Sequence, residues 1–258
     1  MLGAIAGDVI GSVHEFMATK TTDFELFVEG TTFTDDTVLA VAVADCLLNG
    51  RDYVDAFHDY YHAYPDAGYG GRFFEWAAAR AREPYGSFGN GSAMRVPAVG
   101  WAFDSLTDVL EHAARTAAVT HNHPEGIKGA QATAAAIFMS RSGETKSAMK
   151  TYLERTFDYD LSRPLDDLRR SYRFNETCQR TVPEAIIAFL ESADYEDAIR
   201  KAISLGGDAD TLACIAGGIA EAHYGGVPRD IATRTLAILD DRLRGIVVQF
   251  RDRYSHVT

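Results

Sequence analysis

The chain has 258 residues, of which 47% are hydrophobic and 24% are charged, and its formal net charge at pH 7 is −12. This length is enough for one large core, and because no linker, repeat or low-complexity run interrupts it, we expect a single domain over residues 1–258. The negative charge argues against binding to nucleic acids or anionic membranes through overall charge, although it suits a site that attracts Mg²⁺ or Mn²⁺.

The cysteines and the N-terminal segment bear on the cellular compartment. There are three cysteines (Cys46, Cys178 and Cys214), and this odd number without a CxxC pair argues against a disulfide framework or a zinc site. The apolar N-terminal segment lacks a basic region and is interrupted by Asp8, so it is a poor signal peptide. No apolar run is long enough to span a membrane. We therefore expect a soluble cytoplasmic enzyme.

The first predicted element is a helix over residues 2–16, in which apolar residues recur every three or four positions. Three glycines form a separate stripe on it, where another backbone could approach closely: Gly3, Gly7 and Gly11. Asp8, Ser12 and Glu15 are spaced so that they share one face of this helix. A polar face can simply be exposed to solvent, but the glycine stripe beside it favours a helix that is buried or lines a cleft.

Helical periodicity continues through the rest of the chain. Further helices are predicted over 38–48, 52–63, 70–82, 92–103, 105–119, 124–141, 144–157, 183–192, 194–204, 211–223, 228–239 and 240–254. Pro97 should kink or divide one of them. The only candidate strand is 24–28. The sequence thus predicts an all-α domain with functional loops between the helices, at 17–37, 64–71, 83–92, 120–126, 158–182 and 204–211.

Two short acidic segments, 33–37 and 206–211, each run directly into an apolar helix of small residues. A single Asp or Thr before a helix is an ordinary N-cap, and the other polar residues could simply face water. These segments, however, carry more oxygen ligands than capping needs: Thr34, Asp35, Asp36, Asp208, Asp210 and Thr211. If the fold brings the two helix starts together, their carboxylates repel each other unless a divalent cation neutralises them.

The segment 85–95 is the third candidate site. Its glycines precede a predicted helix and can leave backbone N–H groups free to bind anions, while Asn90 offers both a donor and an acceptor. The alternative is an ordinary flexible loop. His121 and His123 lack the spacing of a histidine metal site, so a hydrogen-bonding or base-stacking role at a helix boundary is the better interpretation.

In their order along the chain, these segments resemble the ADP-ribosylglycohydrolase family, which includes the ADP-ribosylarginine and ADP-ribosylserine hydrolases. The matching pieces are 7–11 with Glu15 and Phe16, 33–37, 89–95, 120–121 and 206–211. Each piece alone is a weak signal, but the ordered set is specific and spans residues 3 to about 225. One position differs from some arginine-specific members, which carry an Asp three residues before the Asn of the glycine loop, where this chain has Ser87.

The resemblance implies a single-domain orthogonal multi-helix bundle, with two Mg²⁺ or Mn²⁺ ions at the floor of a cleft. The implied ligands are Thr34, Asp35, Asp36, Asp208, Asp210 and Thr211, with Asp36 also counted as catalytic. Glu15 would lie beside the ions as a ligand or catalytic carboxylate. The implied substrate-binding residues are Asp8, Ser87, Phe88, Gly89, Asn90, Gly91 and His121. Among them, the loop 87–91 would hold the diphosphate and His121 would lie near the adenosine.

The implied reaction is hydrolysis of an N- or O-glycosidic bond at C1″ of ADP-ribose, on a modified protein or a small-molecule conjugate. Bond cleavage gives the ribose oxocarbenium character. The two cations are expected to bind the 2″ and 3″ hydroxyls and to order a water below C1″. We expect Glu15 to act as general base or proton shuttle, with Asp8 supporting it from the same helical face. The acceptor linkage stays open.

Two alternatives remain. The first is an ADP-ribose-binding protein that kept the scaffold but lost turnover, although all the implied ligand positions are filled. The second is an all-α, Mg²⁺-dependent prenyl-type synthase, which typically carries DDxxD within a helix. Here the last position of that pattern is Leu39, and both acidic segments precede their helices.

Overall fold

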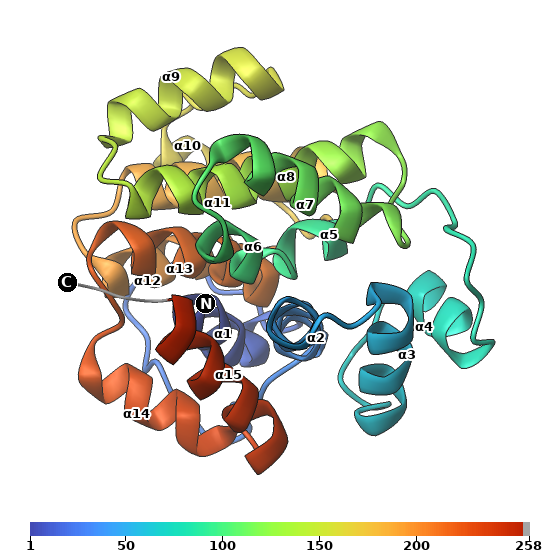
Figure 1. The fold of residues 1–258 in the computed structure, drawn as a ribbon. Helices are drawn as coiled ribbons and strands as arrows, with labels where there is room; N and C mark the ends of the chain where they lie inside the picture. Colours follow the sequence, from blue (N-terminus) through green and yellow to red (C-terminus); the bar gives the residue numbers. More distant parts are fainter. Residues whose placement is uncertain (255–258) are drawn as a thin grey trace.

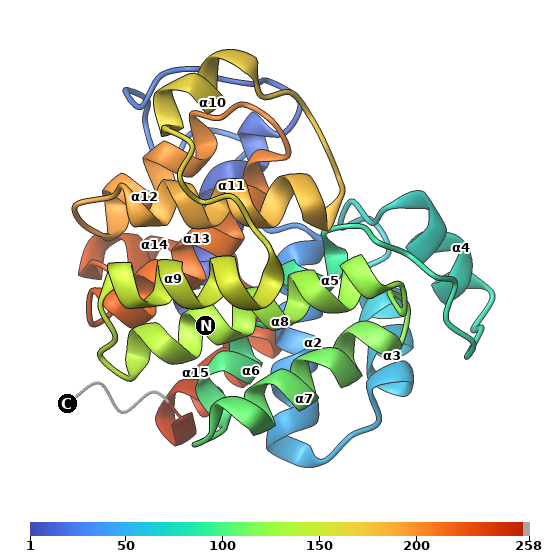
Figure 2. The ribbon, with the colours of Figure 1, turned by 90° about the horizontal axis from the view of Figure 1, so that it is seen from above.

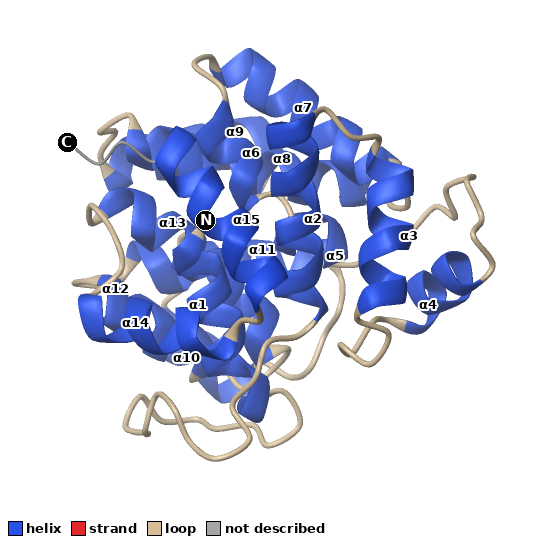
Figure 3. Ribbon diagram, turned by 60° about the horizontal axis from the view of Figure 1, so that its bottom comes forward, coloured by secondary structure: helices blue, strands red, loops and turns tan. Residues whose placement is uncertain are grey.

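The computed structural model describes residues 1–254, and within this range all regular elements are helices (Figure 1, Figure 3). In chain order they are α1 (Leu2–Gly11), the 3-10 turn η1 (Ser12–His14), α2 (Asp35–Asn49), α3 (Tyr53–Ala63), α4 (Gly71–Ala78), α5 (Gly91–Met94), α6 (Pro97–Ala102), α7 (Leu106–Ala118), α8 (Pro124–Arg141), α9 (Lys146–Phe157), α10 (Leu165–Ser171), α11 (Cys178–Leu190), α12 (Tyr195–Ile203), α13 (Ala209–His223), α14 (Arg229–Ile238) and α15 (Asp241–Tyr254). The all-α prediction is confirmed.

The segment 24–28 is not a strand, so that prediction is wrong. Its two phenylalanine rings, Phe24 and Phe27, pack separately against side chains of neighbouring elements instead of pairing in a sheet. The ring of Phe24 lies 4.8 Å from the ring of His14 and beneath the guanidinium of Arg200, and the ring of Phe27 lies beneath the guanidinium of Arg234. The alternation of apolar residues therefore reflects separate contacts along an irregular loop.

Two helix boundaries differ from the predicted ones, and a third is as predicted. The first helix ends at Gly11 and continues as a 3-10 turn, so Glu15 lies beyond it. Pro97 divides 92–103 as expected and begins α6. The predicted loop 158–182 contains α10 and the first turn of α11. The start of α11 is held in place by the amide of Cys178, which donates to the carbonyl of Phe88 at 3.0 Å.

The helices α1 and α13 lie against each other at the centre of the fold (Figure 1). Their backbones nearly touch, since a Cβ added to Gly7 would lie 2.0 Å from the carbonyl oxygen of Ala213. At the end of α1, a Cβ on Gly11 would lie 2.5 Å from the Cα of Asp210. The predicted glycine stripe is therefore the contact that places the second acidic segment beside the first helix.

The irregular segment 15–34 follows η1 and runs along the edge of the molecule occupied by α10 (Figure 2). There the ammonium of Lys20 donates to the carbonyl of Tyr172 at 2.9 Å. The three cysteines are buried and free, as expected for core residues. Within residues 1–254, no helix has both the length and the apolar character that crossing a membrane requires.

We predict that Gly7→Ala lowers the free energy of unfolding by about 2–3 kcal/mol or more, since the added methyl overpacks two backbones that cannot both move away. The matched control is Gly245→Ala in α15, where an added Cβ meets nothing within 4 Å. This control should stabilise the helix by about 0.5–1 kcal/mol. Urea denaturation of both variants measures the two effects, and equal stability of the pair would contradict this view of the α1–α13 contact.

Candidate metal centre and nucleotide cleft

The predicted site segments meet around one cavity of about 220 Å³. One side of it is acidic and is formed by the starts of α2 and α13 and by the segment after η1: Glu15, Asp35, Asp36, Asp208, Asp210 and Thr211. The glycine loop and basic residues also line it: Ser87, Gly89, Asn90, Gly91, Arg72, Arg95 and His121. The fold thus brings together segments that are far apart in the sequence.

The start of α2 is held by Asp8, which the sequence placed among the substrate-binding residues. Its carboxylate accepts hydrogen bonds from the amide and hydroxyl of Thr34 at 3.0 and 2.6 Å, and from the amide of Thr37 at 3.1 Å. The hydroxyl of Thr37 also donates to it. Asp8 is fully buried and does not line the cavity. This geometry favours a supporting role for Asp8 over direct contact with a substrate.

The start of α13 is positioned by contacts to the glycine loop and to α11. The side-chain amide of Asn90 donates to Asp208 at 2.7 Å and to the hydroxyl of Thr181 at 3.1 Å. Gly206 has a φ of +60°, which suits glycine, and its backbone turns the chain into α13. Asn90 therefore orients a carboxylate of the acidic side, in addition to lying in the loop predicted to bind diphosphate.

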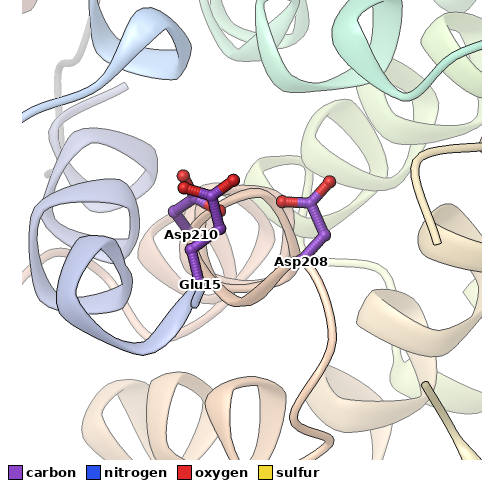
Figure 4. A group of neighbouring side chains, drawn as sticks. All are labelled: Glu15, Asp208 and Asp210. Carbon is purple, nitrogen blue, oxygen red and sulfur yellow. The ribbon is translucent and has the colours of Figure 1, made fainter. Parts of the chain in front are cut away.

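Three carboxylates converge closely enough to hold one ion. One ligand oxygen each from Glu15, Asp208 and Asp210 lies within 4.8 Å of the other two, and the side chains extend to the same side (Figure 4). Asp36 adds a further candidate, because its Oδ1 accepts from the hydroxyl of Thr211 at 3.2 Å while its buried Oδ2 has no partner among the described residues. An all-oxygen donor set with an orphaned carboxylate oxygen fits a hard divalent cation.

The pKa values of the acidic residues also support a bound divalent cation. Burial and the neighbouring carboxylates raise the pKa values of Asp35, Asp36 and Asp210 well above their usual range. Burial, together with the charges of Asp208, Asp8 and Glu176, raises the pKa of Glu15 to about 7. Without a counter-charge these carboxylates resist ionisation at neutral pH, whereas a bound divalent cation favours their ionised form.

Besides Asp8, two further predicted site residues do not line the cavity. Thr34 is the N-cap of α2, and its hydroxyl donates to Asp8 and accepts from the amide of Asp36 at 3.3 Å. It does not line the cavity, so its role as a metal ligand stays a prediction. Phe88 also lies outside the lining, with its ring exposed and 5.2 Å from that of His123.

The glycine loop offers fewer free amides than its composition suggests. The amide of Gly89 donates to the hydroxyl of Ser87 at 3.1 Å, and that of Asn90 donates to the carbonyl of Glu176 at 2.7 Å. The amides of Phe88 and Gly91 make no hydrogen bond to a residue between 1 and 254. Because Phe88 does not line the cavity, anion binding there by the loop backbone would rest on the amide of Gly91, supplemented by side chains around it.

The sequence reasoning missed several residues that line the cavity. Phe174 and Glu176 reach it from the segment before α11, which contains no motif that could have identified them. Arg72 lies beside Tyr85, with its guanidinium carbon 4.8 Å from the ring centroid. Tyr85 and Arg95 belong to the segment 85–95, which its glycines had already marked as a candidate site. Their position in that segment was the only signal that could have identified them as cavity-lining residues.

We predict that Asp36→Asn stabilises the EDTA-treated protein at pH 8. The folded-state pKa of Asp36 lies above its unfolded value, so the folded state binds the proton more readily and this carboxyl removes stability as pH rises. Asparagine avoids that loss. The melting temperature should rise by several degrees, since about 1 kcal/mol corresponds to about 2–4 °C in a domain of this size.

The difference in melting temperature between Asp36→Asn and the wild type should shrink as pH falls, because the wild-type carboxyl then becomes neutral. Adding Mg²⁺ should raise the melting temperature of the wild type more than that of the variant. A melting temperature for Asp36→Asn that is below that of the wild type at pH 8, in EDTA, would contradict the repulsion argument.

Comparisons with known proteins show the family to which the chain is related. The sequence pattern of the ADP-ribosylglycohydrolase family matches residues 1–256. ADP-ribosylhydrolase ARH3 from Xenopus tropicalis is 28% identical over 302 aligned residues, covering 87% of this chain and 86% of that protein. ARH3 from Homo sapiens is 29% identical, covering 87% and 84% of the two chains.

A bacterial relative and a solved structure extend the comparison. ADP-ribosylarginine hydrolase Tri1 from Pseudomonas putida (strain GB-1) is 27% identical, covering 87% of this chain and 69% of that protein. An ADP-ribosylglycohydrolase-related protein complex has a TM-score of 0.71 and 25% identity, covering 97% of this chain and 96% of that chain. Because the family pattern spans nearly all of the sequence, the chain belongs to the ADP-ribosylglycohydrolase family.

Proposed function

We propose that this glycohydrolase cleaves the bond at C1″ of ADP-ribose, removing ADP-ribose from a modified protein side chain or a small-molecule conjugate. The observation that carries the proposal is the convergence of Glu15, Asp208 and Asp210 in a cavity that also contains the glycine loop. The carboxylates suit a ribose whose hydroxyls bind through cations, and the glycine loop with the nearby basic residues suits a diphosphate. One cavity therefore offers both halves of the ligand a complementary surface.

Two divalent cations, Mg²⁺ or Mn²⁺, are proposed as cofactors. The residues that would hold them are Asp35, Asp36, Asp208, Asp210 and Thr211, with Glu15 and Thr34 as further candidates. When bound, such cations neutralise the carboxylates and supply Lewis acidity at the ribose. The orphaned Oδ2 of Asp36 and the raised pKa values of the cluster support this assignment.

The chain's own groups would position the substrate and move the proton. Glu15 is half-buried at the cavity, and a carboxyl with a pKa near the working pH can both accept and return a proton. Asn90 holds Asp208 by its side-chain amide at 2.7 Å, and Asp8 holds the start of α2. Residues 87–91 would bind the diphosphate. The resemblance implied that His121 lies near the adenosine, but its Nε2 would be only 3.2 Å from a Cβ added to Gly91, and this favours a position beside the diphosphate.

The acceptor is a separate question, because relatives of this chain carry different names. ARH3 proteins and an ADP-ribosylarginine hydrolase both match it, at similar identity. Ser87 occupies the position where some arginine-specific members carry Asp, which favours a serine-type acceptor. A catalytically silent binding protein is the second candidate, but every acidic position of the proposed centre is filled, and this favours turnover.

The test is a panel of peptides with defined linkages, ADP-ribosylated on serine or arginine, assayed with Mg²⁺, with Mn²⁺ and with EDTA. We expect free ADP-ribose to appear only with a divalent cation, and from the serine-linked peptide in preference to the arginine-linked one. Cation-dependent binding of ADP-ribose without any product would support the silent protein instead. Release of pyrophosphate from a prenyl diphosphate would indicate the synthase alternative.

A further inference from the structure

His121 is connected to a fully buried guanidinium through one hydroxyl. Nη2 of Arg95 donates to the hydroxyl oxygen of Thr120 at 2.9 Å, and that oxygen lies 2.7 Å from Nδ1 of His121. Arg95 and Thr120 have no solvent exposure, and His121 is 5% exposed. Nη2 of Arg95 also donates to the carbonyl of Thr116 at 2.8 Å, and this contact anchors the guanidinium at the end of α7.

The donor and acceptor inventory favours one direction for this chain of hydrogen bonds. A guanidinium can only donate, so the hydroxyl oxygen of Thr120 must accept from Arg95. Thr120 is then free to use its single proton toward Nδ1 of His121. When Nδ1 accepts a hydrogen bond, a neutral imidazole carries its proton on Nε2.

Nε2 of His121 is the ring atom at the cavity. His121 lines the cavity, and a Cβ added to Gly91 or Gly89 would lie 3.2 or 3.5 Å from Nε2. Nε2 makes no hydrogen bond to any residue of the described chain. The atom that carries the proton is therefore the atom that a bound ligand can reach, directly beside the proposed diphosphate loop.

We propose that Arg95 and Thr120 are positioning residues that hold His121 as a neutral Nε2–H donor, aimed at an oxygen of the bound diphosphate. The identity of that ligand rests on the proposed function, whereas the tautomer is a property of the free protein. Arg95 has no carboxylate partner among residues 1–254, so its buried charge also favours an anion in the cavity. Burial and the charges of Arg95 and Arg72 keep the pKa of His121 well below its usual value, in agreement with a neutral ring.

One neighbouring group could reverse the direction of the hydrogen bond between Thr120 and His121. The hydroxyl of Tyr85 also faces Thr120. If Thr120 gave its proton to Tyr85, Nδ1 of His121 would become the donor and Nε2 would face the cavity as an acceptor. The two arrangements have opposite tautomers, so an observation of the ring itself separates them.

The decisive measurement is the ¹⁵N spectrum of the histidine rings in the metal-free protein at pH 7.5, with His121→Asn used to assign the signals. We expect His121 to show a pyrrole-type Nε2 that carries hydrogen and a pyridine-type Nδ1. A protonated Nδ1, in either the other neutral tautomer or the imidazolium, would overturn the proposal. This result does not depend on whether the protein hydrolyses any ADP-ribose conjugate.

A pair of variants tests the consequence for binding. Thr120→Val removes the hydroxyl at similar volume, and we expect it to weaken ADP-ribose binding about 10-fold or more, as for loss of a hydrogen bond to a charged group. Thr120→Ser keeps the hydroxyl and should restore both the affinity and the wild-type ¹⁵N pattern. Isothermal titration with ADP-ribose and Mg²⁺ measures the affinities. Equal affinity and an unchanged tautomer in Thr120→Val would reject the positioning role of Thr120. Failure of the wild type to bind ADP-ribose would reject the proposed function alone.

Discussion

Asp210→Asn is expected to reduce divalent-dependent release of ADP-ribose by more than about 100-fold, since loss of even a residue that only supports a metal ligand commonly costs 10–100-fold. Asp210 is 4% exposed and lies with Glu15 and Asp208 in the group of converging carboxylates. Asparagine keeps the shape of the side chain but removes the charge that a hard cation requires. Release of ADP-ribose from a modified peptide, measured across a Mg²⁺ titration, gives the size of the loss.

The control for Asp210→Asn is Asp167→Asn. Asp167 is an exposed residue of α10, and its side chain makes a long surface ion pair with Arg170, at 3.7 Å. Its replacement should leave the rate and the Mg²⁺ dependence unchanged, because surface ion pairs contribute little. Full activity of Asp210→Asn at low Mg²⁺ would remove Asp210 from the metal centre, and the same loss in both variants would point to a non-specific effect of charge.

Glu15→Gln is expected to lower kcat by about 10²–10⁴-fold, the range typical of a lost general acid or base, while ADP-ribose affinity changes little. Glutamine is nearly isosteric with glutamate but cannot take up a proton. The matched control is Glu29→Gln, an exposed residue of the same irregular segment, which should behave as wild type. Comparing turnover with ADP-ribose binding separates chemistry from recognition.

The pH profile provides a second readout for Glu15. A general base must be ionised, so kcat of the wild type should rise with pH as Glu15 loses its proton. The pKa of Glu15 is about 7 without cations, and bound cations lower it, so the rise should lie below pH 7 in saturating Mg²⁺. The rise should be absent in Glu15→Gln. Loss of ADP-ribose binding with an unchanged kcat would assign Glu15 a structural role.

The cavity is lined by both carboxylates and basic residues, and this combination suits a ligand that has both a polyhydroxyl sugar and a diphosphate. Carboxylates from α2, α13 and the segment after η1 line it together with Arg72, Arg95 and His121. The carboxylates would need cations to bind the sugar hydroxyls, whereas the guanidinium groups attract an anion directly. This lining would favour an orientation of ADP-ribose with its diphosphate along the glycine loop.

Local patterns in the sequence were sufficient for the fold class and for identifying the segments that meet at the cavity. Helical periodicity predicted an all-α domain, and the glycine stripe predicted the close approach that α1 makes to α13. The acidic segments and the glycine loop were recognisable because helix caps, turns and ligand-rich loops are encoded by residues that are neighbours in the chain.

Only the tertiary structure decided how side chains from distant segments share one cavity. It showed Asp8 supporting the start of α2, brought Phe174 and Glu176 to the cavity from a segment without a motif, and joined Arg95 to His121 through Thr120. These contacts depend on where separate helices meet, and that is set by packing between backbones far apart in sequence. Periodicity and capping describe single elements, so they contain no information on which of those elements face each other.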